Sequence, residues 1–160
     1  MRSRLVWFLV VLMATALAAT PAAAEPPDLP FAVDGKLPDV TFSGDNSLIG
    51  KWCGELIRTR VGNRKYPRLK VCLLILSING DQADVLYAWD THYAYPPMWG
   101  QTTTIVTPSK RSGMPTVLVT ARIASNYYYL RAEFQGDKAS AEWDGTTAYA
   151  PFEGIMEKVR

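Results

Sequence analysis

The sequence predicts an all-β fold, an eight-stranded antiparallel up-and-down barrel that follows an extended N-terminal arm. From Leu48 onward the apolar residues come in short runs separated by Gly, Asn and Asp, and no stretch keeps a sustained helical period. There are eight such runs. Eight short strands suit a sheet that closes on itself, because closure leaves no unpaired edge. An open sandwich of two sheets is the alternative.

The predicted strands are all short and are bounded by turn residues. In chain order they are Gly50–Thr59, Arg68–Ile78, Ala83–Asp90, Thr102–Thr107, Thr116–Ile123, Tyr127–Gln135, Ala139–Trp143 and Phe152–Val159. The chain has no internal repeat and no low-complexity tract. Solenoid and propeller architectures are therefore excluded.

The N-terminus has the three parts of an export signal. Arg2 and Arg4 are followed by the apolar stretch Leu5–Ala19 and by the small residues Ala22–Ala24. We expect residues 1–24 to be a signal peptide that is cleaved after its last alanine. The apolar stretch is shorter than the roughly 20 residues of a membrane-spanning helix, so no transmembrane anchor is expected. The predicted location is the periplasm or the exterior of the cell.

The remaining chain of 136 residues has the size of one domain. It carries 15 basic and 15 acidic residues, so its net charge gives no reason to expect a nucleic-acid partner. Residues 25–47 are rich in Pro, Asp, Gly and Ser and show no apolar period, which predicts an extended arm or linker. Residues 48–160 form the predicted barrel domain.

One hairpin can be counted residue by residue. Gly62-Asn63 is a good two-residue turn, and it fixes a register in which paired residue numbers sum to 125. Pro67 then falls at a non-hydrogen-bonded position, where its missing N–H costs no ladder bond. The register pairs Cys53 with Cys72 and Glu55 with Lys70, and on the other face Trp52 with Leu73, Gly54 with Val71 and Leu56 with Leu69.

The two cysteines are the only ones in the chain, and the hairpin brings them face to face. In an oxidising compartment Cys53 and Cys72 should form a disulfide. A loop of this length stabilises the fold by about 3 kcal/mol in the chain-entropy model. The same count makes the pair hydrogen-bonded, with Cα atoms roughly 5.5 Å apart.

The next hairpin allows two registers, because Asn79-Gly80 fits either a two-residue turn or a three-residue loop with a bulge. In the first register Leu86 and Ala88 share a face with Trp52. In the second register Val85, Tyr87 and Trp89 do, and we favour it because it encloses the larger side chains. The strand Val71–Ile78 is apolar on both faces, so the arm or a partner should cover its outer face.

Gly50-Lys51-Trp52, preceded by Leu48-Ile49, resembles the G-x-W signature of the calycin-type barrels, the lipocalins and avidins. The resemblance implies eight strands in up-and-down order. It also implies that Trp52 plugs one end of the barrel and that a basic side chain from the end of the chain, Arg160 or Lys158, packs across it. Gly50, Trp52 and Arg160 are therefore the predicted barrel signature.

Few residues suggest catalysis. His92 is the only histidine, and no G-x-S-x-G elbow supplies an activated serine. Zinc normally takes three or four ligands, and Asp90 and His92 offer two. A carboxylate pair for glycoside hydrolysis could come from Asp84, Asp90, Glu133 or Glu142, but the sequence does not show whether any two lie at the separation that this reaction needs. We expect no catalytic residues, no metal site and no cofactor, since phosphate-binding and dinucleotide motifs are lacking as well.

Two surface features remain. The hairpin between Arg58 and Lys70 carries six basic residues and no acidic residue. Its tip is either simply exposed to solvent or a binding surface for an anionic partner. The segment from His92 to Trp99 is aromatic and holds two prolines. Rigid aromatic loops are typical anchors for ligands, because they bury much area at little cost in entropy. The alternative is that Tyr95 and Trp99 fold back and close the barrel.

These features favour an exported, non-enzymatic binding barrel for a small apolar or aromatic ligand. The predicted ligand-binding residues are Tyr87, Trp89, Tyr95 and Trp99. The alternative is a protein-binding barrel, such as an inhibitor of an exported protease, whose arm at residues 25–40 would enter the protease cleft. A hydrolase or isomerase with its active site in the barrel is a third hypothesis, for which the sequence gives no set of catalytic residues. The sequence gives no oligomeric state.

Overall fold

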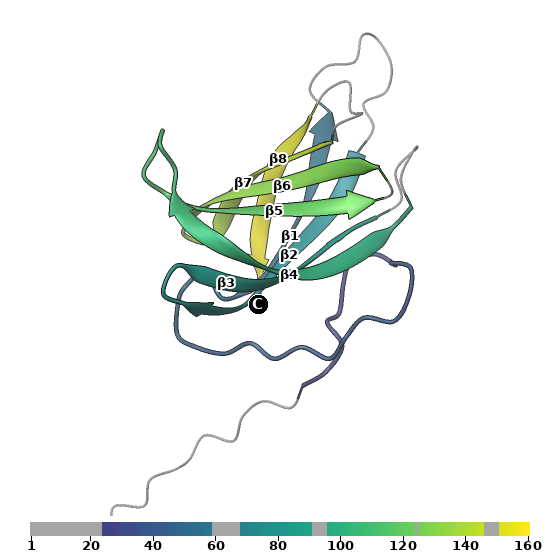
Figure 1. The fold of residues 1–160 in the computed structure, drawn as a ribbon, viewed down its shortest axis with the longest axis horizontal. Coiled ribbons are helices and arrows are strands. Elements are labelled where there is room, and N and C mark those ends of the chain that lie inside the picture. The colour runs from purple at the N-terminus through teal and green to yellow at the C-terminus, as the bar shows by residue number, and fades with distance from the viewer. Residues whose placement is uncertain (1–23, 59–67, 91–95, 124, 146–150) are drawn as a thin grey trace, which may run out of the picture.

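The computed structural model is a closed barrel of eight antiparallel strands in up-and-down order (Figure 1), which confirms the predicted fold class. The structure describes residues 24–58, 68–90, 96–123, 125–145 and 151–160. In these ranges no helix is long and apolar enough to cross a membrane. The strands are β1 (Gly50–Arg58), β2 (Arg68–Asn79), β3 (Gln82–Trp89), β4 (Met98–Pro108), β5 (Pro115–Ile123), β6 (Asn126–Gln135), β7 (Lys138–Gly145) and β8 (Phe152–Val159).

Side chains alternate between the barrel interior and the outer surface, as the period of two in a strand requires. In β6, Tyr128 and Phe134 are buried inside, whereas Tyr129 and Arg131 are exposed outside. The one large difference from the predicted bounds is β4, which begins at Met98 and not at Thr102. It begins earlier because its first residues pair with the end of β3, so the predicted aromatic loop is partly a strand.

Closure of the barrel brings β1 and β8 unusually close together. A Cβ at Gly54 would collide with the carbonyl oxygen of Ile155 and would lie 2.8 Å from Cα of Met156. A Cβ at Gly154 would lie 2.7 Å from the carbonyl oxygen of Glu55. Two glycines on facing strands therefore allow an approach that no other residue permits.

The first hairpin has the predicted register, and Cys53 and Cys72 form the predicted disulfide. The predicted turn, Gly62-Asn63, and Pro67 lie outside the described residues. The predicted hydrogen-bonding phase is wrong. The Cα atoms of the two cysteines are 4.2 Å apart, close to the spacing of a non-hydrogen-bonded pair.

Lys70 shows the phase directly. Its backbone N–H donates to Oδ1 of Asp90 at 2.9 Å, and its carbonyl oxygen accepts the N–H of Asp90 at 3.0 Å. Both backbone groups of Lys70 therefore point toward the β3 side and away from β1. Residues two apart point the same way along a strand, so Cys72 also occupies the close, non-hydrogen-bonded site opposite Cys53.

The second hairpin combines the two predicted alternatives. Asn79 pairs with Gln82, so the turn has two residues, and the register shifts between Ile75 and Ser77 inside β2. The bulge therefore lies in the strand and not in the loop. Beyond it Leu73 pairs with Tyr87 and Val71 with Trp89. The predicted placement of Val85, Tyr87 and Trp89 inside the barrel is confirmed.

The arm covers the outer face of β2, which explains why this strand is apolar on both faces. Leu29, Phe31, Leu37 and Val40 pack against a second apolar cluster outside the barrel, which is made by Cys72, Leu74, Leu76, Leu86 and Trp99. Isolated bridges join Glu25 to Val40 and Ser43 to Ser77. In Figure 1 the arm runs in blue along the underside of the sheet.

Trp52 closes the end of the barrel at which β1 begins. Its indole N–H donates to the carbonyl oxygen of Leu48 at 2.8 Å, and its ring meets Phe134 edge-on at 4.8 Å. Lys158 lies across it, with Nζ 5.4 Å from the ring centroid. Lys158 is thus one of the two basic residues that the resemblance implied for this place. Arg160, the other and the one included in the predicted barrel signature, does not lie there: its side chain is exposed and pairs with Asp137 at 3.2 Å.

Loss of the disulfide should destabilise the fold measurably. We expect the Cys53→Ala, Cys72→Ala double variant to lose about 3 kcal/mol of unfolding free energy, because the bridge spans 19 residues of chain. Urea denaturation followed by tryptophan fluorescence measures this. Reductant should lower the midpoint of the wild type and leave that of the variant unchanged. Equal midpoints for the wild type with and without reductant would contradict the prediction.

Candidate functional site

An aromatic cluster fills the end of the barrel opposite Trp52. Tyr87 stacks on Trp89 with ring centroids 5.8 Å apart, and Tyr128 stacks on Trp143 at 5.3 Å. Trp89 joins the two stacks, since its centroid lies 5.9 Å from that of Trp143. Phe152 meets Trp143 edge-on. None of the five rings is more than 8 % exposed.

Two glycines make room for the tyrosine rings of this cluster. Gly100 of β4 pairs with Tyr87, and a Cβ there would collide with the Tyr87 hydroxyl group. Gly145 of β7 pairs with Tyr128, and a Cβ there would lie 2.7 Å from Cδ1 of that ring. Each tyrosine therefore lies over the backbone of the neighbouring strand.

The cluster holds hydrogen-bond donors that have no acceptor. Trp89 is 1 % exposed, and its Nε1 has no hydrogen-bond partner in the described part of the chain. Burial raises the pKa of Tyr87, so its hydroxyl group keeps its proton at neutral pH. Arg58 lies over Phe152, 4.9 Å from guanidinium carbon to ring centroid, and its buried Nε is likewise unpartnered. A buried unsatisfied donor costs about 1–3 kcal/mol.

Two of the four predicted ligand-binding residues lie together. Tyr87 and Trp89 are neighbours in the cluster. Trp99 is not part of it: it belongs to the outer apolar cluster under the arm, where its Nε1 would lie 3.7 Å from a Cβ at Gly35. The prediction for Trp99 assumed a loop, whereas β4 already includes this residue and alternation turns it outward. Tyr95 and His92 lie outside the described residues.

The sequence did not reveal that the seam between β4 and β5 is mostly unpaired. Only three residue pairs join these strands, from Val106 with Val117 to Pro108 with Pro115, whereas the other seams have six to eight. Beyond them the hydroxyl group of Thr104 donates to the carbonyl oxygen of Leu118 at 2.6 Å. In Figure 1 the two ribbons lie apart in the middle of the view.

A groove of about 1060 Å³ lies on the outer face of β5–β8, beneath the hairpin that joins β4 to β5. Pairing across the sheet sets its floor in two rows. One row is Leu118, Arg131, Glu142 and Glu153, and the other is Thr116, Glu133, Ser140 and Ile155. Lys110 and Arg111 line the hairpin side. The groove is therefore amphipathic, with both signs of charge.

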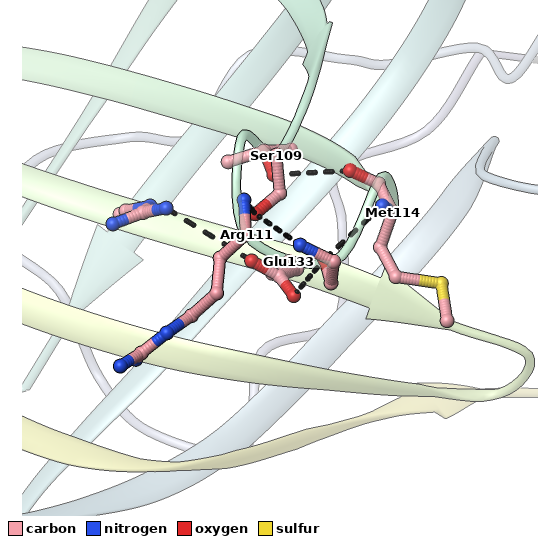
Figure 2. A network of polar contacts seen from close by, with 7 residues as sticks. Ser109, Arg111, Met114 and Glu133 are labelled. Carbon is pink, nitrogen blue, oxygen red and sulfur yellow. Dashed lines mark hydrogen bonds and ion pairs between the residues drawn. The ribbon is translucent and has the colours of Figure 1, made fainter.

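Glu133 fastens the hairpin to the sheet (Figure 2). Its Oε1 accepts the Ser112 hydroxyl group at 2.6 Å, and its Oε2 lies 3.9 Å from a guanidinium nitrogen of Arg131. Ser109 closes the loop by donating its N–H to the carbonyl oxygen of Met114 at 2.8 Å. Hydrogen bonds from Ser112 and Ser109, with Arg131 nearby, hold the pKa of Glu133 below its ordinary value. The Glu133 carboxylate therefore has a structural role, which is to hold the hairpin between β4 and β5 against the sheet.

Glu142 and Glu153 are the free carboxylates of the groove. They face each other directly across β7 and β8, and neither forms a hydrogen bond or ion pair within the described ranges. Like charges at such a cross-strand position repel and destabilise the sheet. An external positive charge would relieve this repulsion.

Nothing in the described ranges assembles a metal centre, since no three His, Cys, Asp or Glu side chains gather there. No protein-family model, curated protein or solved structure matches the chain. The closed eight-stranded barrel is compatible with the calycin-type architecture, which is a statement about fold alone.

Acid should release the hairpin that Glu133 holds. The folded-state pKa is depressed, so the carboxylate stabilises the fold above its ordinary pKa of 4.5, and this stabilisation is lost as the pH falls through the folded-state value. We therefore expect Glu133→Gln to lower the thermal midpoint at pH 7 and to match the wild type at pH 3. Glu142→Gln, on the same face without a partner, is the control: it removes one charge of the Glu142–Glu153 pair and should raise the midpoint at pH 7 instead of lowering it.

Proposed function

We propose that the protein is an exported, non-enzymatic binding barrel for a small aromatic ligand. The observation that supports this most is the cluster of two aromatic stacks joined through Trp89 at one end of the barrel. A flat aromatic ligand that inserts between these rings replaces contacts among the side chains with contacts between ligand and side chains. Each such aromatic contact is worth about 0.5–1.5 kcal/mol beyond the area buried. The disulfide between Cys53 and Cys72 agrees with an oxidising compartment.

The arrangement of polar groups supports binding and not catalysis. Among the described residues, the polar groups at the cluster include the Trp89 indole N–H and the Arg58 guanidinium group, which only donate, and the protonated Tyr87 hydroxyl group. General acid–base catalysis needs a base within hydrogen-bond reach of the substrate. Glu133, whose pKa is lowered by hydrogen bonds from Ser112 and Ser109, serves the outer hairpin.

The tryptophan indole signals in a ¹H–¹⁵N spectrum test the proposal, because the tryptophans lie in different surroundings. We expect 2-naphthol to shift the signals of Trp89 and Trp143 in the cluster. Trp52, bonded to Leu48, and Trp99, under the arm, are internal controls and should stay in place. If Trp89 and Trp143 do not respond at millimolar 2-naphthol, or if only Trp99 responds, the proposed function is wrong.

A protein-binding barrel is the second candidate, and the outer groove favours it. The unpartnered pair Glu142 and Glu153 calls for a positive charge, and Leu118 and Ile155 are each 48 % exposed beside it. A polypeptide segment with Lys or Arg next to an apolar residue complements both features. Such a partner would use the barrel wall and leave the interior untouched.

Selection from a displayed library of random linear peptides tests this candidate. We expect enriched peptides to combine Lys or Arg with apolar residues and to bind at least about tenfold more weakly to the Glu142→Lys, Glu153→Lys variant. The Asp39→Lys, Asp45→Lys variant, which makes the same charge change on the exposed arm, should bind them normally. Lack of enrichment, or equal loss in both variants, would argue against the groove.

A further inference from the structure

We infer that the ligand of the aromatic cluster is a planar aromatic molecule with a hydrogen-bond acceptor, that it reaches the cluster through the unpaired seam between β4 and β5, and that the Trp89 indole N–H holds the acceptor. This inference rests on the proposed function and adds to it the class of ligand and its path.

The seam is the weak wall of the barrel. Between Met98–Ile105 of β4 and Leu118–Ile123 of β5 no residues are paired, although β4 is fully paired with β3 on its other side. Backbone groups that lack ladder partners open at low cost in free energy. The three pairs beside the hairpin and the Glu133 network hold one end of the seam together. Separation can therefore occur toward the other end, where the cluster lies.

On the β4 side of the seam the inward side chains are small. Gly100, Thr102 and Thr104 alternate inward along β4, whereas Val119 and Ala121 face inward from β5. Thr102 and Thr104 are half-exposed although they point inward, so solvent reaches this side of the wall. Directly behind them stands Tyr87, packed on Gly100.

The unsatisfied groups at this position define the chemistry of the ligand. Trp89 lies next to Tyr87 in the stack, 1 % exposed, with an indole N–H that lacks an acceptor. The Tyr87 hydroxyl group, which remains protonated, forms no hydrogen bond with the described residues and is a second donor at the seam. The buried polar residues of the described ranges are Ser109 and Thr116, so no buried carboxylate awaits a cation there.

An acceptor therefore fits where a cation does not. Aromatic faces alone would also attract a cation, but Arg58, a charged group that contacts the cluster, is itself positive and already lies over Phe152. A carboxylate accepts hydrogen bonds that are roughly twice as strong as those between neutral groups. An aromatic carboxylate is thus the class that satisfies both the stacked rings and the unpartnered donors.

Three naphthalenes of nearly equal shape test the acceptor: 2-naphthoate, 2-methylnaphthalene and the 2-naphthylmethylammonium ion. We expect the wild type to bind 2-naphthoate about tenfold or more tightly than 2-methylnaphthalene, and the ammonium ion most weakly. Trp89→Phe keeps an aromatic ring and removes the N–H, so it should bring the first two affinities together. Trp99→Phe, under the arm, is the control and should preserve the difference.

Substitution at Thr102 tests the path. Thr102→Phe places bulk on the inner side of the seam and should weaken binding of 2-naphthoate and 2-methylnaphthalene alike, by about tenfold. Gln101→Phe adds the same ring on the exposed outer side of β4 and should change neither affinity. Thr102→Leu provides a smaller block, and the indole signal of Trp52 reports whether each variant has folded.

The outcomes separate the inference from the proposed function. If no naphthalene shifts the Trp89 signal, the proposed function fails. If all three bind with equal affinity, or if Trp89→Phe retains the preference for 2-naphthoate, a binding barrel stands and the acceptor assignment is overturned. If folded Thr102→Phe and Thr102→Leu bind as the wild type does, access through the seam is overturned.

Discussion

The contact between β1 and β8 is the constraint on which the rest of the barrel depends. Gly54 and Gly154 lie where each facing backbone leaves no space for a Cβ, so the first and last strands can pair along their whole length. Pairing there converts a curled sheet into a ring. Once the ring is closed, alternation decides every other placement, because each strand must send every second residue to a common interior.

Closure does not distribute the pairing evenly. The interior residues of most strands are large and apolar, so packing holds those strands together from within. β4 is the exception, since it sends Gly100, Thr102 and Thr104 inward and gains little from burial. A ring fixed firmly at β1–β8 and packed weakly at β4 concentrates its unpaired backbone on the opposite side. The aromatic cluster lies behind that weak wall, so the proposed ligand site and the least paired seam of the barrel share strand β4.

Most of the fold could be predicted because its signals are local. The register of Cys53 with Cys72 follows from counting, and the inward position of Tyr87 and Trp89 follows from apolar alternation. The sequence did not show which pairs of that hairpin are hydrogen-bonded and which are not. The same register allows both arrangements, and only backbone contacts such as those of Lys70 distinguish them. The effect of the bulge, which turns Tyr87 and Trp89 to the face of Trp52, was predicted correctly. Its position was not: it lies at Ile75–Ser77 in the strand and not in the loop.

The candidate site was harder to predict because it depends on strand pairing that is missing and on contacts between residues far apart in the sequence. The run Thr102-Thr103-Thr104, polar on both faces, is the signal that could have revealed a poorly packed strand. Trp99 looked like a loop anchor because Pro96 and Pro97 precede it and Gly100 follows it, and both residue types are depleted in strands. The rows of the outer groove join four strands, and no local pattern announces a pairing such as Glu142 with Glu153.

The disulfide lies beneath the arm, and this has a consequence for the order of assembly. Cys72 is fully buried in the outer apolar cluster, and Cys53 packs against it. Oxidants and oxidoreductases must reach a sulfur atom to exchange it. We therefore expect the bond to form before the arm at residues 25–47 docks, after which the arm covers Cys72. Any later rearrangement of the bond would then begin with release of the arm.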